Sequence, residues 1–124
     1  EAIHRCSAEG IRINTTLVFT PNQALLAALA GAAFLSPFVG RLDDVSYDGM
    51  ELIHECVRLV ETHNLTARVL AASLRHPLHV TQAAMAGAHI GTIPPSLIPQ
   101  MLKHPLTDLG IDRFLADART AGLI

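Results

Sequence analysis

The sequence predicts an α/β fold of about four βα units plus carboxyl-terminal helices, equivalent to half of a (β/α)8 TIM barrel. Short apolar runs alternate with segments of helical pattern, which is typical of a parallel sheet with helical connections. The 124 residues are close to half of the roughly 250 that a complete barrel needs. A complete four-stranded α/β sandwich is the alternative, but its usual glycine-rich phosphate-binding loop is absent. We expect residues 1–124 to form one half-barrel without a second domain.

Four segments are short and apolar, as buried parallel strands are. Two of them follow an Ala-Gly-Ala sequence, at residues 30–32 and 86–88, and then run into a proline. Glycine there supplies the left-handed end of a helix, and the alanines let that helix pack closely on the sheet. The predicted strands are Ile13–Phe19, Ala33–Phe38, Arg68–Ala72 and Ala88–Ile93.

The segments between and after these strands have helical signals. Pro21 suits the first turn of a helix, and the apolar residues between Leu52 and Val60 recur at the spacing of one buried helical stripe. Residues 40–47 are predicted to be a loop. The predicted helices are Ala2–Ala8, Pro21–Leu29, Asp48–Thr62, Leu78–Ala86, Ser96–Lys103 and Asp108–Thr120.

Composition excludes several classes of function. The net charge is −2 with acids and bases mixed along the chain, so no basic face for nucleic acid is expected. No apolar run approaches the roughly 20 residues that span a membrane, and the two isolated cysteines indicate reduced thiols in a cytoplasmic protein. The chain opens on Glu1 as if inside a helix, and we interpret it as a fragment.

Polar side chains gather where the predicted strands end. Active-site groups of (β/α)8 barrels lie at the carboxyl ends of strands, and residues two apart on a strand face the same side. Hydroxyls, amides and guanidinium groups suit a phosphorylated, polyhydroxylated ligand. The candidates are Asn14 and Thr16 on the first strand, Ser36, Phe38 and Arg41 on the second, and Ser73 and Arg75 on the third.

Each candidate also has a plainer interpretation. A single serine or threonine can satisfy backbone groups in a turn, and Arg41 can pair with Asp43 or Asp44. Arg75 can be a solvated loop residue. His76 and His79 flank Pro77 without further ligands nearby, so no metal site is expected.

Taken together, six segments resemble the small-type transaldolases, a family that also includes fructose-6-phosphate aldolases and belongs to the class I aldolases. The resemblance covers almost the whole chain and places it at strands five to eight, the carboxyl-terminal half of the family's barrel. The segments are Asn14-Thr15-Thr16-Leu17-Val18-Phe19, Asn22-Gln23-Ala24, Ala30-Gly31-Ala32, Ser36-Pro37-Phe38-Val39-Gly40-Arg41-Leu42-Asp43-Asp44, Ala71-Ala72-Ser73-Leu74-Arg75 and Met101-Leu102-Lys103-His104-Pro105-Leu106-Thr107-Asp108.

The resemblance implies aldol transfer without a cofactor. A lysine forms a Schiff base with a ketose phosphate, and a dihydroxyacetone unit passes to an aldose phosphate. Asn14 and Ser36 would hold the hydroxyls of that unit, and Thr16 would help to place the water that relays protons. The substrate phosphate would be held by Arg41, Ser73 and Arg75.

Phe38 stands where fructose-6-phosphate aldolases carry a tyrosine that assists proton transfer. A phenyl ring cannot do this, which favours transaldolase over free aldol cleavage. The family's Schiff-base lysine precedes the first residue of this chain, and Lys103 is the only lysine present. We therefore expect the chain alone to be inactive.

The expected partners are sugar phosphates and the amino-terminal half of the same enzyme or another copy, within a homo-oligomer. Three alternatives remain. The chain can be a non-catalytic half-barrel that pairs with itself and binds a sugar phosphate or a protein, a fructose-6-phosphate aldolase, or a different (β/α)8 aldolase or isomerase.

Overall fold

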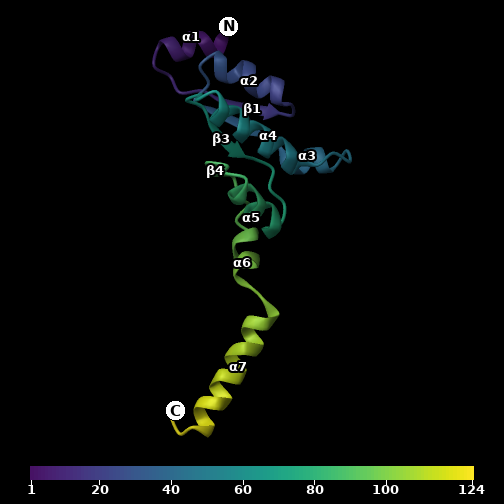
Figure 1. Ribbon diagram of the computed structural model, residues 1–124, viewed down its shortest axis with the longest axis vertical. Coiled ribbons are helices and arrows are strands. Elements are labelled where there is room, and N and C mark those ends of the chain that lie inside the picture. Colours follow the sequence, from purple (N-terminus) through teal and green to yellow (C-terminus); the bar gives the residue numbers. More distant parts are fainter.

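The computed structural model describes residues 1–124, in which one or two helices separate successive strands and two helices follow the last strand (Figure 1). The strands are β1 (Asn14–Val18), β2 (Phe34–Pro37), β3 (Arg68–Ala71) and β4 (Ile90–Gly91). The helices are α1 (Ala2–Ala8), α2 (Pro21–Leu29), α3 (Val39–Asp43), α4 (Gly49–Thr62), α5 (Pro77–Met85), α6 (Leu97–Leu102) and α7 (Pro105–Thr120).

The four strands form one parallel sheet in the order β1-β2-β3-β4. Neighbours in the chain are thus neighbours in the sheet, and a helix joins each pair. Asn14 pairs with Phe34, Phe34 with Arg68, and Leu70 with Ile90. The predicted α/β class is confirmed, and the arrangement is consistent with part of a TIM barrel. β1 and β4 each pair with one strand, so each has an open edge.

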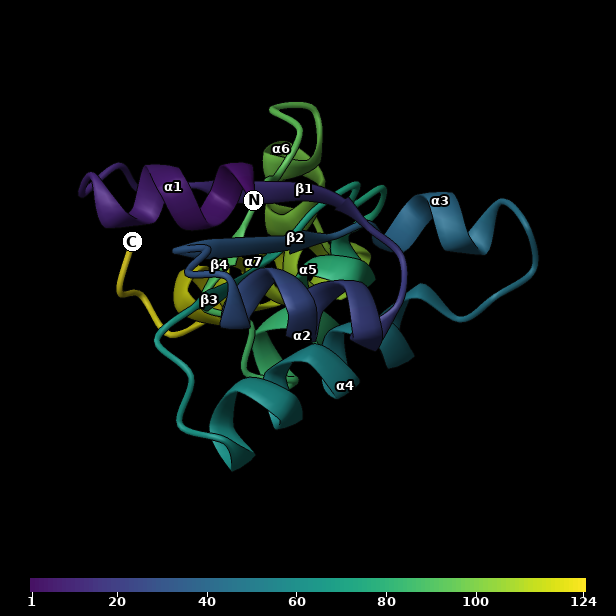
Figure 2. The ribbon, with the colours of Figure 1, turned by 90° about the horizontal axis from the view of Figure 1, so that it is seen from above.

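The core lies between the sheet and the helices on one of its faces. Figure 2 shows α2 and α4 side by side below β1 and β2, and residues of α2, α4 and α5 share the buried cluster with the strands. The predicted stripe on α4 is the centre of that cluster, with Ile53 and Cys56 fully buried. Burial raises the pKa of the Cys56 thiol to about 12, so this cysteine is an inert core residue.

Most predicted elements differ from the observed ones by one residue at an end, and three differ by more. Residues 40–43, expected in a loop, belong to α3, whose first turn is held by contacts with distant parts of the chain. β4 shrinks from the predicted Ala88–Ile93 to two residues. α7 begins at Pro105 rather than Asp108, because His104 accepts a hydrogen bond from the Leu106 N–H and Pro105 suits the first turn.

α7 extends away from the sheet along the long axis of the molecule and contains no buried residue (Figure 1). It carries Leu106, Leu109, Ile111, Phe114 and Leu115 as exposed apolar side chains. None of the helices has the length and apolar character needed to cross a membrane.

The core position of Ile53 generates a stability prediction. Ile53→Ala leaves a cavity in the α4 packing and should lower the free energy of unfolding by about 2–5 kcal/mol. Leu29→Ala is the matched control, because Leu29 is 65% exposed and should cost far less. Urea unfolding measures both, and equal losses would contradict the assigned core.

Candidate functional site

The ends of β1, β2 and β3 are held together beyond the regular strands. The Phe38 N–H donates to the Val18 carbonyl, and Phe38 and Ala72 form a parallel bridge. The Val39 N–H donates to Ala72 and the Gly40 N–H to Ser73, each at 3.0 Å. Phe38, Arg41, Ser73 and Arg75 therefore lie at or just beyond the carboxyl ends of β2 and β3, as expected for site residues of a parallel sheet, whereas Asn14 is the first residue of β1.

Asn14 and Ser36 are brought into direct contact across β1 and β2. The Ser36 hydroxyl donates to Asn14 Oδ1 at 2.7 Å. Ser36 is 2% exposed whereas Asn14 is exposed, so the hydroxyl fixes the amide from beneath. Because Oδ1 accepts this bond, the Asn14 amide nitrogen is left to donate to an oxygen of a bound molecule.

Thr16 lies on the same exposed side as Asn14 but is held less firmly. Its hydroxyl makes no hydrogen bond within the chain, and β1 has an irregular register between Thr15 and Val18. Leu17 adopts a left-handed backbone (φ 57°) in this bulge, while the Thr15 hydroxyl is buried without a partner. The regular alternation of side chains between the two faces of β1, which places Thr16 on the same side as Asn14, therefore ends at Thr16.

Phe38 and Arg41 form a second contact. The Arg41 guanidinium lies 5.1 Å from the centre of the Phe38 ring, and Phe38 meets Phe19 edge to face at 5.9 Å. Arg41 has no carboxylate partner, so the ion pair with Asp43 or Asp44 considered from the sequence is not formed. Its guanidinium remains exposed, with its N–H groups available to an anion.

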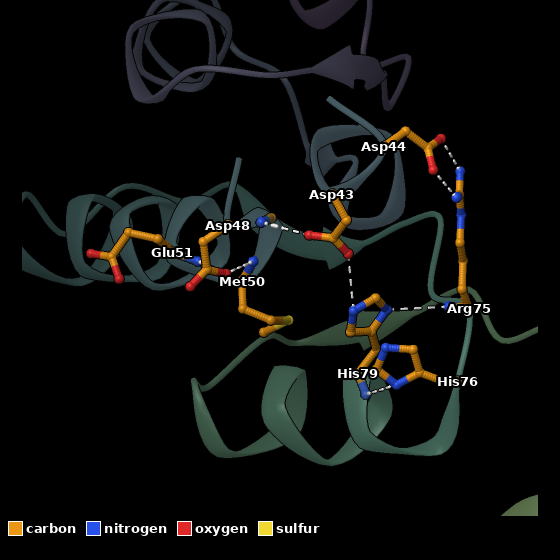
Figure 3. Close-up of polar contacts among 9 residues, drawn as sticks. Asp43, Asp44, Asp48, Met50, Glu51, Arg75, His76 and His79 are labelled. Carbon is orange, nitrogen blue, oxygen red and sulfur yellow. Dashed lines mark hydrogen bonds and ion pairs between the residues drawn. The ribbon is translucent and has the colours of Figure 1, made fainter. Parts of the chain in front are cut away.

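Asp44 pairs with Arg75 instead. Its two carboxylate oxygens face Nη1 and Nη2 of the guanidinium, the latter at 2.6 Å, so Arg75 is a paired residue and not a freely solvated one (Figure 3). The hydrogen bond from Arg75 holds the pKa of Asp44 below its usual value, and Arg41 adds to this. Phosphate uses the same bidentate geometry on a guanidinium as carboxylate does.

The backbones of Ser73 and Gly40 lie in close contact beside Arg75. Ser73 has a left-handed backbone (φ 58°), and its carbonyl accepts the Gly40 N–H. A Cβ at Gly40 would lie 2.6 Å from that carbonyl oxygen, so only glycine fits. We did not select Gly40 from the sequence, although its place inside the Ser-Pro-Phe-Val-Gly-Arg segment was a usable signal.

His79 and Asp43, which were not among the candidate residues, lie behind Arg75. His79 is buried and its Nε2 lies 3.1 Å from Asp43 Oδ2, while its Nδ1 accepts the Arg75 N–H at 3.3 Å (Figure 3). Burial, and then the neighbouring His76, lower the pKa of His79. The only hint in the sequence was a histidine pair flanking the proline that starts α5. No group of three or more His, Cys, Asp or Glu side chains is arranged to hold a metal ion.

The fold and these residues together define a class: an α/β protein built as part of a (β/α)8 barrel, with polar and cationic groups at the carboxyl ends of its strands. The chain belongs to the Transaldolase/Fructose-6-phosphate aldolase family, whose model matches residues 1–122.

Relatives support this assignment. A "Probable transaldolase" of Thermus thermophilus is 57% identical over 117 residues, which cover 94% of this chain and 52% of the relative. One from Symbiobacterium thermophilum is 58% identical over 121 residues, covering 98% of this chain and 56% of the relative. The chain thus spans about half the length of the curated relatives it matches.

A solved structure from Pediococcus acidilactici, described as a lactate oxidase, superposes with a TM-score of 0.58 at 18% identity. The superposition covers 73% of this chain and 26% of that one. This likeness is one of fold alone.

The close approach at Gly40 generates a second prediction. Gly40→Ala should push Ser73 and Arg75 away from α3 and lower the free energy of unfolding by about 1–3 kcal/mol. Gly110→Ala is the matched control, since its Cβ would meet nothing within 4 Å and should be neutral or stabilising. Thermal unfolding and the amide chemical shifts of Ser73 and Arg75 test both variants, and unchanged shifts in Gly40→Ala would contradict the packing.

Proposed function

We propose that this chain is the carboxyl-terminal part of a transaldolase, which transfers a dihydroxyacetone unit between sugar phosphates through a lysine Schiff base. The observation that carries the proposal is the Asn14–Ser36 hydrogen bond across β1 and β2, together with Arg41, Ser73 and Arg75 just beyond the carboxyl ends of β2 and β3. Membership of the family and the relatives described as probable transaldolases support it.

The Asn14–Ser36 pair and the two arginines would bind different parts of the substrate. The Asn14 amide, backed by the buried Ser36 hydroxyl, would hold a hydroxyl of the dihydroxyacetone unit. Arg41, with free N–H groups, and Arg75, in a bidentate geometry, would hold the phosphate with the Ser73 hydroxyl. Thr16, exposed beside Asn14, would help to place the water that relays protons.

Phe38 favours transfer over free aldol cleavage. Its ring lies between Phe19 and Arg41 and has no hydroxyl to give or take a proton at the reacting carbons. Fructose-6-phosphate aldolase remains the alternative within the family, and the acceptor decides between them: a transaldolase needs an aldose phosphate for turnover.

The Schiff-base lysine would come from outside these 124 residues. Lys103 is exposed at the end of α6, and the α6–α7 connection lies away from the ends of β1, β2 and β3 (Figure 1). The amino-terminal half of the same enzyme would supply the lysine and pair with the open edges of β1 and β4.

Those open edges also favour a second candidate function. Two copies of this chain could pair edge to edge as a non-catalytic half-barrel that binds sugar phosphates or a protein, because unpaired strand edges are templates for another strand. Such a pair would lack the lysine, so covalent trapping separates the two functions.

The proposal is tested by trapping. The chain is combined with the part of the Thermus thermophilus relative that precedes the matched region, and fructose 6-phosphate and borohydride are added. Intact mass should show a dihydroxyacetone-sized adduct on the amino-terminal polypeptide and none on this chain. An adduct on Lys103 would refute the proposal, and so would the absence of any adduct when the two polypeptides form a folded pair. If no adduct forms but the pair binds phosphate tightly, the result would favour the non-catalytic half-barrel.

The residues proposed to bind the substrate phosphate generate a kinetic prediction. In the paired enzyme Arg75→Ala should raise KM for fructose 6-phosphate about tenfold to a hundredfold, because a charge-assisted hydrogen bond to the phosphate is lost. Arg58→Ala removes an exposed arginine of α4 and should leave KM unchanged. Equal KM values for the two variants would argue against the assignment of Arg75.

Asp44 occupies the face of Arg75 that a phosphate would use, so its removal should favour anions. Asp44→Asn in the 124-residue chain should bind sulfate about threefold to tenfold more tightly, as measured by calorimetric titration. Asp112→Asn, an exposed change of equal charge on α7, is the control. Weaker sulfate binding in Asp44→Asn would mean that the carboxylate supports the site rather than competing for it.

A further inference from the structure

Arg75 is anchored from behind by a buried histidine. The His79 ring comes from the first turn of α5 and lies between α3 and the backbone of residue 75 (Figure 3). Its Nδ1 accepts the Arg75 N–H at 3.3 Å, and its Nε2 lies 3.1 Å from Asp43 Oδ2. His79 is 7% exposed, whereas the Asp43 side chain is 37% exposed. The Nδ1 contact is with the main chain of Arg75, whereas Asp44 contacts the Arg75 guanidinium.

The two contacts specify one protonation state. An N–H donor on Arg75 requires a lone pair on Nδ1, and a carboxylate on the other side requires a hydrogen on Nε2. The neutral ring with its proton on Nε2 satisfies both. A protonated ring carries a hydrogen on Nδ1 as well, which would face the Arg75 N–H donor to donor and break that bond.

Asp43 is itself fixed, so it can hold the ring in place. Its Oδ1 accepts the Gly49 N–H at 3.0 Å, at the start of α4, while Oδ2 faces His79. Gly49 is packed so tightly that a Cβ there would meet the Val39 backbone at 2.7 Å. One carboxylate therefore ties α3, α4 and α5 together behind the anion-binding residues.

We propose that His79, held by Asp43, is a positioning residue for the phosphate site: in its neutral form it anchors the Arg75 backbone, and its protonation releases that anchor. The inference rests on the proposed function only in assigning Arg75 to a phosphate; the anchor itself is a statement about this chain. His79 touches no substrate and acts through Arg75.

The surrounding charges determine the pH range of the effect. Burial of the His79 ring disfavours its protonated form, and so do His76 at the N-cap of α5 and Arg75 in the preceding loop. Asp43 on α3 favours the protonated form, and the balance lowers the pKa of His79 from its ordinary value. From α4, the Asp48 carboxylate is engaged by the Met50 and Glu51 N–H groups of its own helix. The anchor is thus intact at neutral pH and is lost as the pH falls through the lowered pKa of His79.

Two variants of similar size test the roles of the His79 Nδ1 and Nε2 atoms separately. His79→Asn keeps an acceptor close to the position of Nδ1 and does not titrate, whereas His79→Gln places its polar group close to Nε2 and leaves the Arg75 N–H without a partner. His76→Asn is the control, because it removes the neighbouring imidazole while asparagine keeps the N-cap bond to the His79 N–H.

The test is made on the full 124-residue chain by NMR and sulfate titration. Sulfate is the probe because its charge does not change in this pH range. We expect ring nitrogen shifts of the Nε2-protonated tautomer at about pH 7.5 and a protected Arg75 amide. Protection and sulfate affinity should fall about fivefold in His79→Gln. They should fall equally in the wild type and in His76→Asn when an acid titration, followed by the ring nitrogen shifts, protonates His79, but they should not fall over the same titration in His79→Asn.

Other results would overturn the inference. An Nδ1-protonated tautomer would place the ring the other way round. Unchanged Arg75 protection in folded His79→Gln would show that the contact does not anchor the backbone. Sulfate binding that tightens on acidification in the wild type but not in His79→Asn would show that the ring acts as a charge. The tautomer and exchange results do not depend on catalysis, so failure of the trapping experiment leaves them decisive.

Discussion

The backbone pairing between the ends of β2 and β3 is the constraint on which the candidate site depends. The strands stop at Pro37 and Ala71, yet the hydrogen bonds continue through Val39 to Ala72 and Gly40 to Ser73. That continuation turns the chain into α3 immediately beside the loop that leads to α5. The side chains on these two short segments meet only because their backbones are already joined, and a glycine at position 40 makes the approach possible.

Two consecutive carboxylates then separate the structural and the exposed parts of this region. Asp43, whose side chain is 37% exposed, joins the start of α4 to the buried His79 on α5. Asp44 faces outward and pairs with the Arg75 guanidinium, where both side chains are about half exposed. An exposed ion pair contributes little to stability because water screens it, so its partner can be exchanged for another anion at small cost. The contacts of the buried His79 ring with Asp43 and with the Arg75 N–H would keep the arginine backbone in place during such an exchange.

The four-stranded sheet is open at both edges, β1 and β4. Its helices cover one face, while Asn14 and Thr16 lie exposed on the strand whose outer edge has no neighbour. The matched relatives are about twice as long as this chain, and the family assignment covers residues 1–122. In the proposed transaldolase, the Asn14–Ser36 pair and the arginines beside α3 would form one half of the substrate site.

By itself, the sequence determined the α/β order of strands and helices, the α4 stripe and the position of Ser36, Arg41, Ser73 and Arg75 at or beyond the carboxyl ends of β2 and β3, while the roles of these residues stay predictions. These features depend on periodicity, proline and glycine, which act over a few residues. Only the tertiary structure decided that residues 39–43 form a helix, that Asp44 pairs with Arg75 rather than Arg41, and that His79 lies behind the site. The physical reason is range: Asp44 and Arg75 are 31 residues apart, and nothing in either segment shows which partner the folded backbone will bring within reach.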